Sequence, residues 1–364
     1  MEIATLVVVV MVIVTALIFD FTNGFHDTAN AMATSIATGA LKPRTAVIAA
    51  GTLNLIGAFL STEVAQTISG GLINEQQVAI GPEFIFAGLV GAILWNLLTW
   101  LVGLPSSSSH ALFGGLVGAV IVGAGFEGVN FMGVLTKILI PALVSVLVAA
   151  LAATCATKLI GLVTRGMDES KVESGFRHGQ TVTACLVALS HGTNDAQKTM
   201  GIITLTLVAA GMQPSGSGGW RVIRTLGKGL TEISTPQGFA AEASSATTIL
   251  VSSHLGFALS TTQVCSGSII GSGLGKGTPV NWKVAGRMLI AWLVTFPAAA
   301  IVGGVACAVT KVGMWGVIVV AVLAVLGAFI IVRLSHRNPV NSMNVNESGD
   351  VKINAEATTA AQAA

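Results

Sequence analysis

Long apolar runs, separated by short polar breaks, constrain this chain more than any other feature. A helix needs roughly 20 residues to cross the hydrocarbon core of a bilayer. Several runs reach that length, whereas others are shorter or carry polar residues, as broken or re-entrant helices do. We therefore predict an all-α polytopic membrane protein with roughly 8–12 membrane segments. The runs lie near residues 3–19, 44–61, 84–104, 111–125, 131–160, 180–190, 199–211, 284–309 and 314–334.

The composition agrees with a membrane protein surrounded by lipid. Hydrophobic residues make up 53% of the chain and charged residues 9%, whereas soluble domains carry about 25% charged residues. The net charge of +2 gives no reason to expect a nucleic-acid partner. The four cysteines lie singly, without metal-ligand spacing, so we expect no resident metal or cofactor. The apolar N-terminus lacks a basic leader and is predicted to be a retained helix.

A densely charged stretch near the middle, residues 165–178, must lie in water. It predicts a linker between two membrane-embedded parts, and the polar C-terminal segment is typical of disorder. We divide the chain into a first transmembrane repeat (1–160), a charged linker (161–178), a second transmembrane repeat (179–335) and a disordered tail (336–364).

Two motifs occur in both halves, in the same order. The first half has GFHDTAN at 24–30 and PSSSSH at 105–110, and the second has GTNDAQK at 192–198 and LSTTQ at 259–263. Internal duplication with interrupted helices is the signature of a secondary transporter, whose site lies where the repeats meet. The sequence therefore predicts a transporter with a site built from both halves.

Asp27 and Asp195 hold matching places in the first motif pair. A charged side chain at the bilayer centre costs about 2.5–3.5 kcal/mol on insertion scales, so two of them indicate cation or proton binding. A structural carboxylate that caps a broken helix or pairs with Lys198 is the alternative. Lys198 follows Asp195 by three residues and shares its helix face. It either bridges Asp195 or neutralises an anionic substrate.

Hydroxyl side chains dominate the second motif pair. Hydroxyls and helix N-termini donate hydrogen bonds to anions, and Pro105 is suited to opening such a helix. The alternative is that these hydroxyls bond back to helix carbonyls, as is common in membrane helices. The recurrence in both halves favours an anion site formed by Ser107, Ser108, Ser109, Ser260, Thr261 and Thr262.

Titratable side chains lie beside these motifs. Glu242 interrupts a small apolar stretch, while His26 and His110 belong to the motifs themselves. Histidine titrates near neutral pH, so together with the aspartates these residues could relay protons. Each histidine alone is equally compatible with a hydrogen-bonded packing role.

In its paired motifs the chain resembles the inorganic phosphate transporter (PiT) family. The family has G-x-N-D-x-A-N-A and P-x-S-x-T-H elements in two copies, and the resemblance extends to about residue 335. It implies inverted repeats, a homodimer in the prokaryotic cytoplasmic membrane, and symport of inorganic phosphate with Na⁺ or H⁺. By position, Asp27, Asn30, Asn194 and Asp195 match the family's ion and phosphate motif. The hydroxyl clusters match its phosphate-binding hydroxyls, and Glu242 matches an acidic residue before the second cluster.

Three residues depart from the sodium-coupled members of that family. His26 stands where they have Asn, Asn54 where they usually have Glu, and Gln263 where the motif has His. The first two, together with D-A-Q-K, are similar to a bacterial low-affinity branch. That resemblance implies a proton-driven symporter of phosphate, taken free or as a metal complex. Sodium coupling and a sulfate permease of the same family are the alternatives.

Two other classes of protein deserve comparison. An intramembrane hydrolase could use Ser109, His110 and Asp27. However, the sequence has neither G-x-S-x-G nor H-E-x-x-H, and a single-nucleophile enzyme has no use for duplicated motifs. A passive anion channel would not need paired buried carboxylates. We therefore expect a transporter and not an enzyme.

Overall fold

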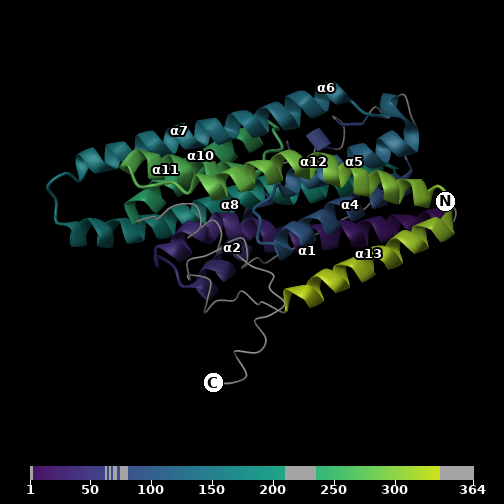
Figure 1. Cartoon of the computed structure of the whole chain (residues 1–364), viewed down its shortest axis with the longest axis horizontal. Helices are drawn as coiled ribbons and strands as arrows, with labels where there is room; N and C mark the ends of the chain where they lie inside the picture. Colours follow the sequence, from purple (N-terminus) through teal and green to yellow (C-terminus); the bar gives the residue numbers. More distant parts are fainter. Residues whose placement is uncertain are drawn as a thin grey trace, which may run out of the picture.

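The computed structural model describes residues 3–61, 64, 67–68, 72–73, 81–209 and 235–336, and its regular elements there are all helical. This confirms the predicted all-α class. The helices are α1 (Ile3–Ala37), α2 (Pro43–Gly57), α4 (Pro82–Leu101), α5 (Ser108–Ala124), η1 (Phe126–Gly128), α6 (Phe131–Val134), η2 (Leu135–Leu139), α7 (Ile140–Val163), α8 (Glu169–Ala209), α10 (Thr235–His254), α11 (Thr261–Lys276), α12 (Trp282–Thr310) and α13 (Met314–Ser335) (Figure 1).

Within the described part, five helical segments are long and apolar enough to cross a bilayer. They differ in how much protein surrounds them. The α4 segment is 72% buried inside the molecule, whereas α13 is only 11% buried and lies on the outside of the bundle. In Figure 1, α7 and α13 lie along opposite edges of the bundle, with α4 and α12 between them. The five segments are Leu6–Gly24, Pro82–Leu101, Phe131–Val163, Trp282–Thr310 and Met314–Ser335.

Two helical hairpins, α4–α5 and α10–α11, carry the hydroxyl motifs. After the first helix of each hairpin, a glycine with positive φ reverses the chain: Gly103 at 67° and Gly256 at 71°. This conformation strains a residue that has a Cβ atom. The chain then stays extended until the second helix begins, so each hydroxyl motif lies at a hairpin tip, where a helix starts.

Close helix contacts fix those tips. A Cβ atom on Gly118 of α5 would lie 2.0 Å from the Ala300 carbonyl oxygen of α12. On Gly271 of α11 it would lie 2.1 Å from the Ala150 carbonyl oxygen of α7. Only glycine allows backbones to approach this closely, as in membrane helix pairs generally. Each short helix is therefore held against a long one, and its N-terminus is placed precisely by that packing.

The helix boundaries correct three of the sequence expectations. The apolar run 3–19 is only the first part of α1, which continues through Asp27 to Ala37. The run 180–190 and the described part of the run 199–211, up to Ala209, belong to one helix, α8. The Asp motifs therefore lie inside continuous helices, and the breaks lie at the hydroxyl motifs. Polar residues inside α1 and α8 lower the hydrophobicity of the sequence there, so each helix looks interrupted. Contacts between the two helices, such as Asn23 with Asp195 and Thr199 with Asp20, allow these polar residues inside the bundle.

Helices α10 and α11 have no counterpart among the predicted spans. Their sequences are rich in hydroxyl side chains, which lower the apparent hydrophobicity. Several of these hydroxyls donate to the carbonyl four residues earlier: Thr247 at 2.9 Å, Thr248 at 2.8 Å and Ser253 at 2.9 Å. A hydroxyl bonded in this way is compatible with a membrane helix.

The charged stretch predicted as a linker is mostly helical. Helix α7 ends at Val163 and α8 begins at Glu169, so the turn itself covers 164–168 and the following charged residues form exposed turns of α8. The division into repeats stays a prediction. The predicted tail beyond His336 lies outside the described residues.

Candidate functional site

Asp27 connects the two hydroxyl motifs. Its side chain on α1 is 1% exposed and accepts a hydrogen bond from the Thr262 hydroxyl at 2.8 Å. It also accepts one from the hydroxyl of Ser108. Ser108 starts α5 and Thr262 lies in the first turn of α11, so one carboxylate binds the tips of both hairpins. Residues from the two predicted halves thus meet at one buried carboxylate.

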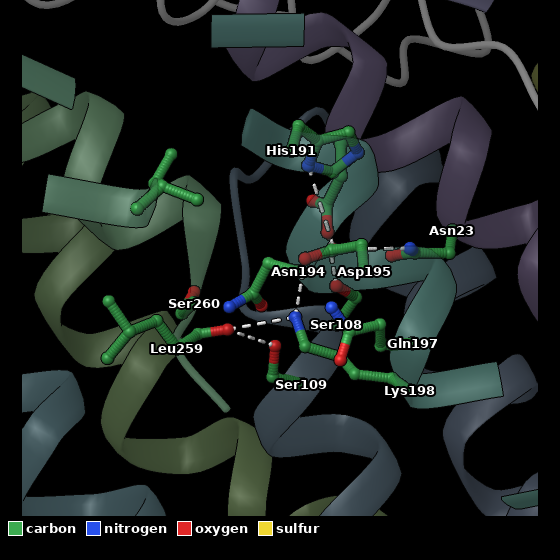
Figure 2. A network of polar contacts seen from close by, with 12 residues as sticks. Asn23, Ser108, Ser109, His191, Asn194, Asp195, Gln197, Lys198, Leu259 and Ser260 are labelled. Atoms are coloured by element: carbon green, nitrogen blue, oxygen red, sulfur yellow. Dashed lines mark hydrogen bonds and ion pairs between the residues drawn. The ribbon is translucent and has the colours of Figure 1, made fainter. Parts of the chain in front are cut away.

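Asp195 lies in the same polar centre but has different partners. The Lys198 ammonium contacts its Oδ1 at 2.5 Å, and both side chains are almost fully buried. The same ammonium donates to the Leu259 carbonyl oxygen at 2.8 Å, which also accepts from the Ser109 hydroxyl at 2.9 Å. Figure 2 shows this network. Lys198 therefore joins α8 to the extended segment before α11, and Ser109 brings α5 to the same point.

The other carboxylate oxygen of Asp195 faces α1. It accepts from the Asn23 amide at 3.3 Å and lies 3.8 Å from Nδ1 of His191, one turn earlier on α8. In Figure 2 these two side chains approach Asp195 from the side away from Leu259. Asp195 is thus enclosed by donors from its own helix and from α1.

Ser107 and Ser260 occupy the N-cap positions of α5 and α11. The Ser107 hydroxyl accepts from the His110 backbone amide at 3.1 Å, and Ser260 does the same for Gln263 at 3.4 Å. Their backbone angles agree closely, with φ −95° and ψ 106° at Ser107, and φ −93° and ψ 107° at Ser260. Serine favours this position because its side chain satisfies an amide that has no partner inside the helix. The duplicated motif thus produces the same local structure twice.

Several buried polar atoms around the hairpin tips have no hydrogen-bond partner among the described residues. They are Asn194 Oδ1, Thr261 Oγ1, His110 Nε2 and Gln263 Oε1. Native proteins pair most buried polar atoms, so such a group indicates a place for water or a ligand. Three of these residues also make a contact that holds the side chain: the Asn194 amide donates to Ser253 Oγ at 3.0 Å, and Gln263 Nε2 lies 3.4 Å from His110 Nδ1.

Glu242 lies in a second buried network. Its carboxylate accepts from the hydroxyls of Thr34 and of Thr183, the latter at 2.7 Å, and from the Gln180 amide at 3.2 Å. Thr34 comes seven residues after Asp27 on α1, which is about 10 Å along the helix axis. Glu242 therefore lies apart from the aspartate centre, between α1, α8 and α10.

Two predicted site residues, His26 and Asn30, have side chains outside the described part of the structure. The Ser-His-Asp arrangement does not form among the residues described. The Ser109 hydroxyl donates to a backbone carbonyl, whereas Asp27 accepts a hydrogen bond from the hydroxyl of Ser108. His110 faces Gln263 through its Nδ1.

The polar centre also contains residues that were not predicted from the sequence. Asn23 contacts Asp195, and Asp20 accepts from the Thr199 hydroxyl at 2.8 Å. Along α1, Asp20, Asn23 and Asp27 follow spacings of three and four residues, which place them on one helix face. That spacing was the signal available in the sequence, because a polar stripe in an apolar helix indicates a polar partner helix.

The fold and the centre define a polytopic helical membrane protein with polar hairpin tips enclosed in its interior. The family model of the phosphate transporter family matches residues 23–170 and 162–303. The chain therefore belongs to the phosphate transporter family. As a member it is a transporter and not an enzyme, and it is a multi-pass protein of the cytoplasmic membrane.

Relatives from bacteria cover almost the whole chain. A protein of Mycobacterium tuberculosis (strain ATCC 25618 / H37Rv), described as a probable low-affinity inorganic phosphate transporter, is 52% identical, covering 98% of this chain and 91% of its own length. A Bacillus subtilis (strain 168) protein of the same description is 40% identical, over 83% of this chain and 96% of its own. Among solved structures, a sodium-dependent phosphate transporter shares the fold, with a TM-score of 0.73 and 22% identity over 84% of this chain and 99% of that one.

Proposed function

We propose that this chain is a secondary active symporter that moves inorganic phosphate into the cell together with protons. The observation that carries the proposal is the Asp27 carboxylate, which binds Ser108 from one hairpin and Thr262 from the other. A carboxylate in this position makes the geometry of both hairpin tips depend on what it binds. Family membership and the names of the bacterial relatives support phosphate as the substrate.

The groups at the hairpin tips suit a tetrahedral oxyanion. The N-termini of α5 and α11 supply backbone amides and the positive ends of two helix dipoles. The Thr261 hydroxyl and Nε2 of His110 have no partner among the described residues and would bind substrate oxygens. Asn194 Oδ1 would accept from a phosphate hydroxyl. Sulfate has no proton to donate at pH 7, so an acceptor here favours phosphate.

Transport would proceed by alternating access between two inverted repeats. The matching geometry at Ser107 and Ser260 supports a duplicated scaffold. Asp27, Asp195 and Lys198 are each no more than 2% exposed, which suits an occluded arrangement of the cycle. Movement of one hairpin away from Asp27 would open the centre on one side of the membrane.

Protons are the proposed coupling ion. Asp27 and Asp195 are buried carboxylates inside the membrane-spanning bundle, and ionisable groups in such places are typical of proton relays. Glu242, surrounded by hydroxyl and amide donors, is another buried carboxylate for proton transfer. The departures of His26 and Asn54 from the sodium-coupled pattern support the same assignment.

Labelled phosphate uptake into proteoliposomes tests the proposal, with proton and sodium gradients imposed separately. We expect accumulation driven by an inward proton gradient, abolished by a protonophore and unaffected by sodium. Uptake that follows the sodium gradient alone would show that sodium, and not the proton, is the coupling ion. Phosphate entry that never exceeds the outside concentration would indicate a channel. Excess sulfate should compete poorly, and equal competition would remove the preference for phosphate.

The form of the substrate is tested in the same vesicles. Uptake of labelled phosphate with and without Mg²⁺, together with uptake of a labelled divalent cation, separates free phosphate from a metal complex. Stoichiometric entry of metal and phosphate would assign the complex. We also propose a homodimer, which follows from the family resemblance. The mass of the purified protein in nanodiscs should then correspond to two chains.

A further inference from the structure

The two aspartates occupy matching motif positions, and a cation that belongs to the chain itself lies against the second. The Lys198 ammonium lies 2.5 Å from Asp195 Oδ1 and 2.8 Å from the Leu259 carbonyl oxygen. The position that corresponds to Lys198 in the first motif is Asn30, a neutral residue. The duplication therefore differs by one positive charge at equivalent places.

The oxygens around this ammonium resemble the ligands of a small cation. Leu259 belongs to the extended segment before α11, and unwound carbonyls of this kind coordinate Na⁺ in transporters built from repeats. The Ser109 hydroxyl bonds the same carbonyl at 2.9 Å, and Asn23 binds the other oxygen of Asp195 at 3.3 Å. A carboxylate oxygen and a backbone carbonyl oxygen thus bind the ammonium, and a hydroxyl lies next to them on the same carbonyl.

We infer that Lys198 is a tethered cation that fills a monovalent-cation site in the second half and keeps that site closed to sodium. An ammonium bound to the chain has a high local concentration and needs no ion from solution. It neutralises Asp195, which alone would be expensive to bury. Removing the ammonium opens the site, and Asp195, Leu259 and Ser109 would then hold a sodium ion. The inference deepens the proposed transport function, but it is tested by sodium binding and stability, without a transport assay.

The decisive variant is Lys198→Asn, which gives the second half the residue of the first. The purified protein in nanodiscs is assayed for ²²Na⁺ binding and for thermal unfolding in sodium chloride or choline chloride at equal ionic strength. Wild type should bind no ²²Na⁺ and unfold at the same temperature in both salts. Lys198→Asn should bind ²²Na⁺ and unfold at a temperature a few degrees higher in sodium than in choline.

Three further proteins control the experiment. Lys198→Arg keeps a tethered charge and should stay insensitive to sodium. The double variant Asp195→Asn with Lys198→Asn removes both charges and should fold without binding sodium. Lys311→Asn removes an exposed ammonium that also donates to a carbonyl, that of Val122 at 2.6 Å, and should behave as wild type.

Each outcome decides the inference. If Lys198→Asn folds in sodium but not in choline, the opened site is supported. If it folds in neither salt, or folds without responding to sodium, the inference is wrong. Wild-type binding of ²²Na⁺ that disappears in Asp195→Asn would also overturn it. These measurements need no transport, so a wild type that fails to take up phosphate would contradict the proposed function and leave this inference standing.

Discussion

Asp27 on α1 and Asp195 on α8 hold matching places in two motifs, yet they bind different partners. Hydroxyls from both hairpins donate to Asp27, whereas an ammonium three residues away on the same helix binds Asp195. Elsewhere in the two halves the local backbone recurs at corresponding helix starts. Asn130 caps α6 with φ −80° and ψ 81°, and Asn281 caps α12 with φ −77° and ψ 83°. The same N-cap geometry thus occurs in both halves, whereas the side chains that contact the two aspartates differ.

The largest difference between the halves should appear on removing the charge of Asp195. Asp195→Asn leaves the Lys198 ammonium buried without its partner, and such a loss costs about 3–5 kcal/mol. We expect a large fall in the unfolding temperature in detergent and no concentrative phosphate uptake. Asp168→Asn is the control and should stay close to wild type, because this exposed side chain accepts from Ser170 at the start of α8 and asparagine keeps an acceptor oxygen there. A stable Asp195→Asn protein would mean that the Lys198 ammonium finds another partner when the Asp195 charge is absent.

Asp27→Asn should separate transport from stability. The amide cannot accept from both Ser108 and Thr262 as the carboxylate does, and each such bond to a charged group contributes about 1.5–3 kcal/mol. The variant should therefore lose less stability than Asp195→Asn, while concentrative uptake should still be abolished. Unfolding temperature and uptake are measured on the same preparations. Normal accumulation by Asp27→Asn would remove Asp27 from the coupling mechanism.

Neighbouring threonines at the start of α11 sharpen the comparison further. Thr262→Val removes a donor to Asp27 and should lower both stability, by about 1.5–3 kcal/mol, and uptake. Thr261→Val removes a hydroxyl that has no partner among the described residues, so the unfolding temperature should stay the same or rise slightly. If Thr261 binds substrate, the KM for phosphate should rise roughly fivefold to tenfold. Equal effects of the two substitutions on stability would contradict this assignment.

The sequence predicted the two aspartates and the two hydroxyl clusters because both patterns are duplicated and polar in apolar surroundings. It did not predict which partner each aspartate takes. Lys198 shares a helix face with Asp195 by spacing alone, but the contact between Thr262 and Asp27 joins residues 235 positions apart. Such a contact depends on how α11 packs on α7 through Gly271, which no local pattern reveals.

The hydrophobicity of the sequence also did not predict that α8 is one continuous helix. Helix α8 contains charged, amide and hydroxyl residues along much of its length and so looks like two short runs. Some of its polar side chains bind α1 or the segment before α11, as Thr199 binds Asp20 and Lys198 binds the Leu259 carbonyl oxygen. Glu242 was grouped with the aspartates because it lies near the hydroxyl motif in sequence. Its contacts with Thr34 and Thr183 place it in a separate network.

The smallest predicted effect concerns the feature that the halves share. Ser107→Ala and Ser260→Ala each remove an N-cap side chain, a loss that typically costs about 1 kcal/mol. Because the two caps have nearly the same backbone angles, both variants should lower the unfolding temperature by the same small amount. Ser107→Asp and Ser260→Asp should keep the caps but place a negative charge beside the proposed anion site, and so lower uptake more than the alanine variants do. If Ser107→Ala and Ser260→Ala lowered the unfolding temperature by different amounts, the two caps would be equivalent in backbone geometry but not in energy.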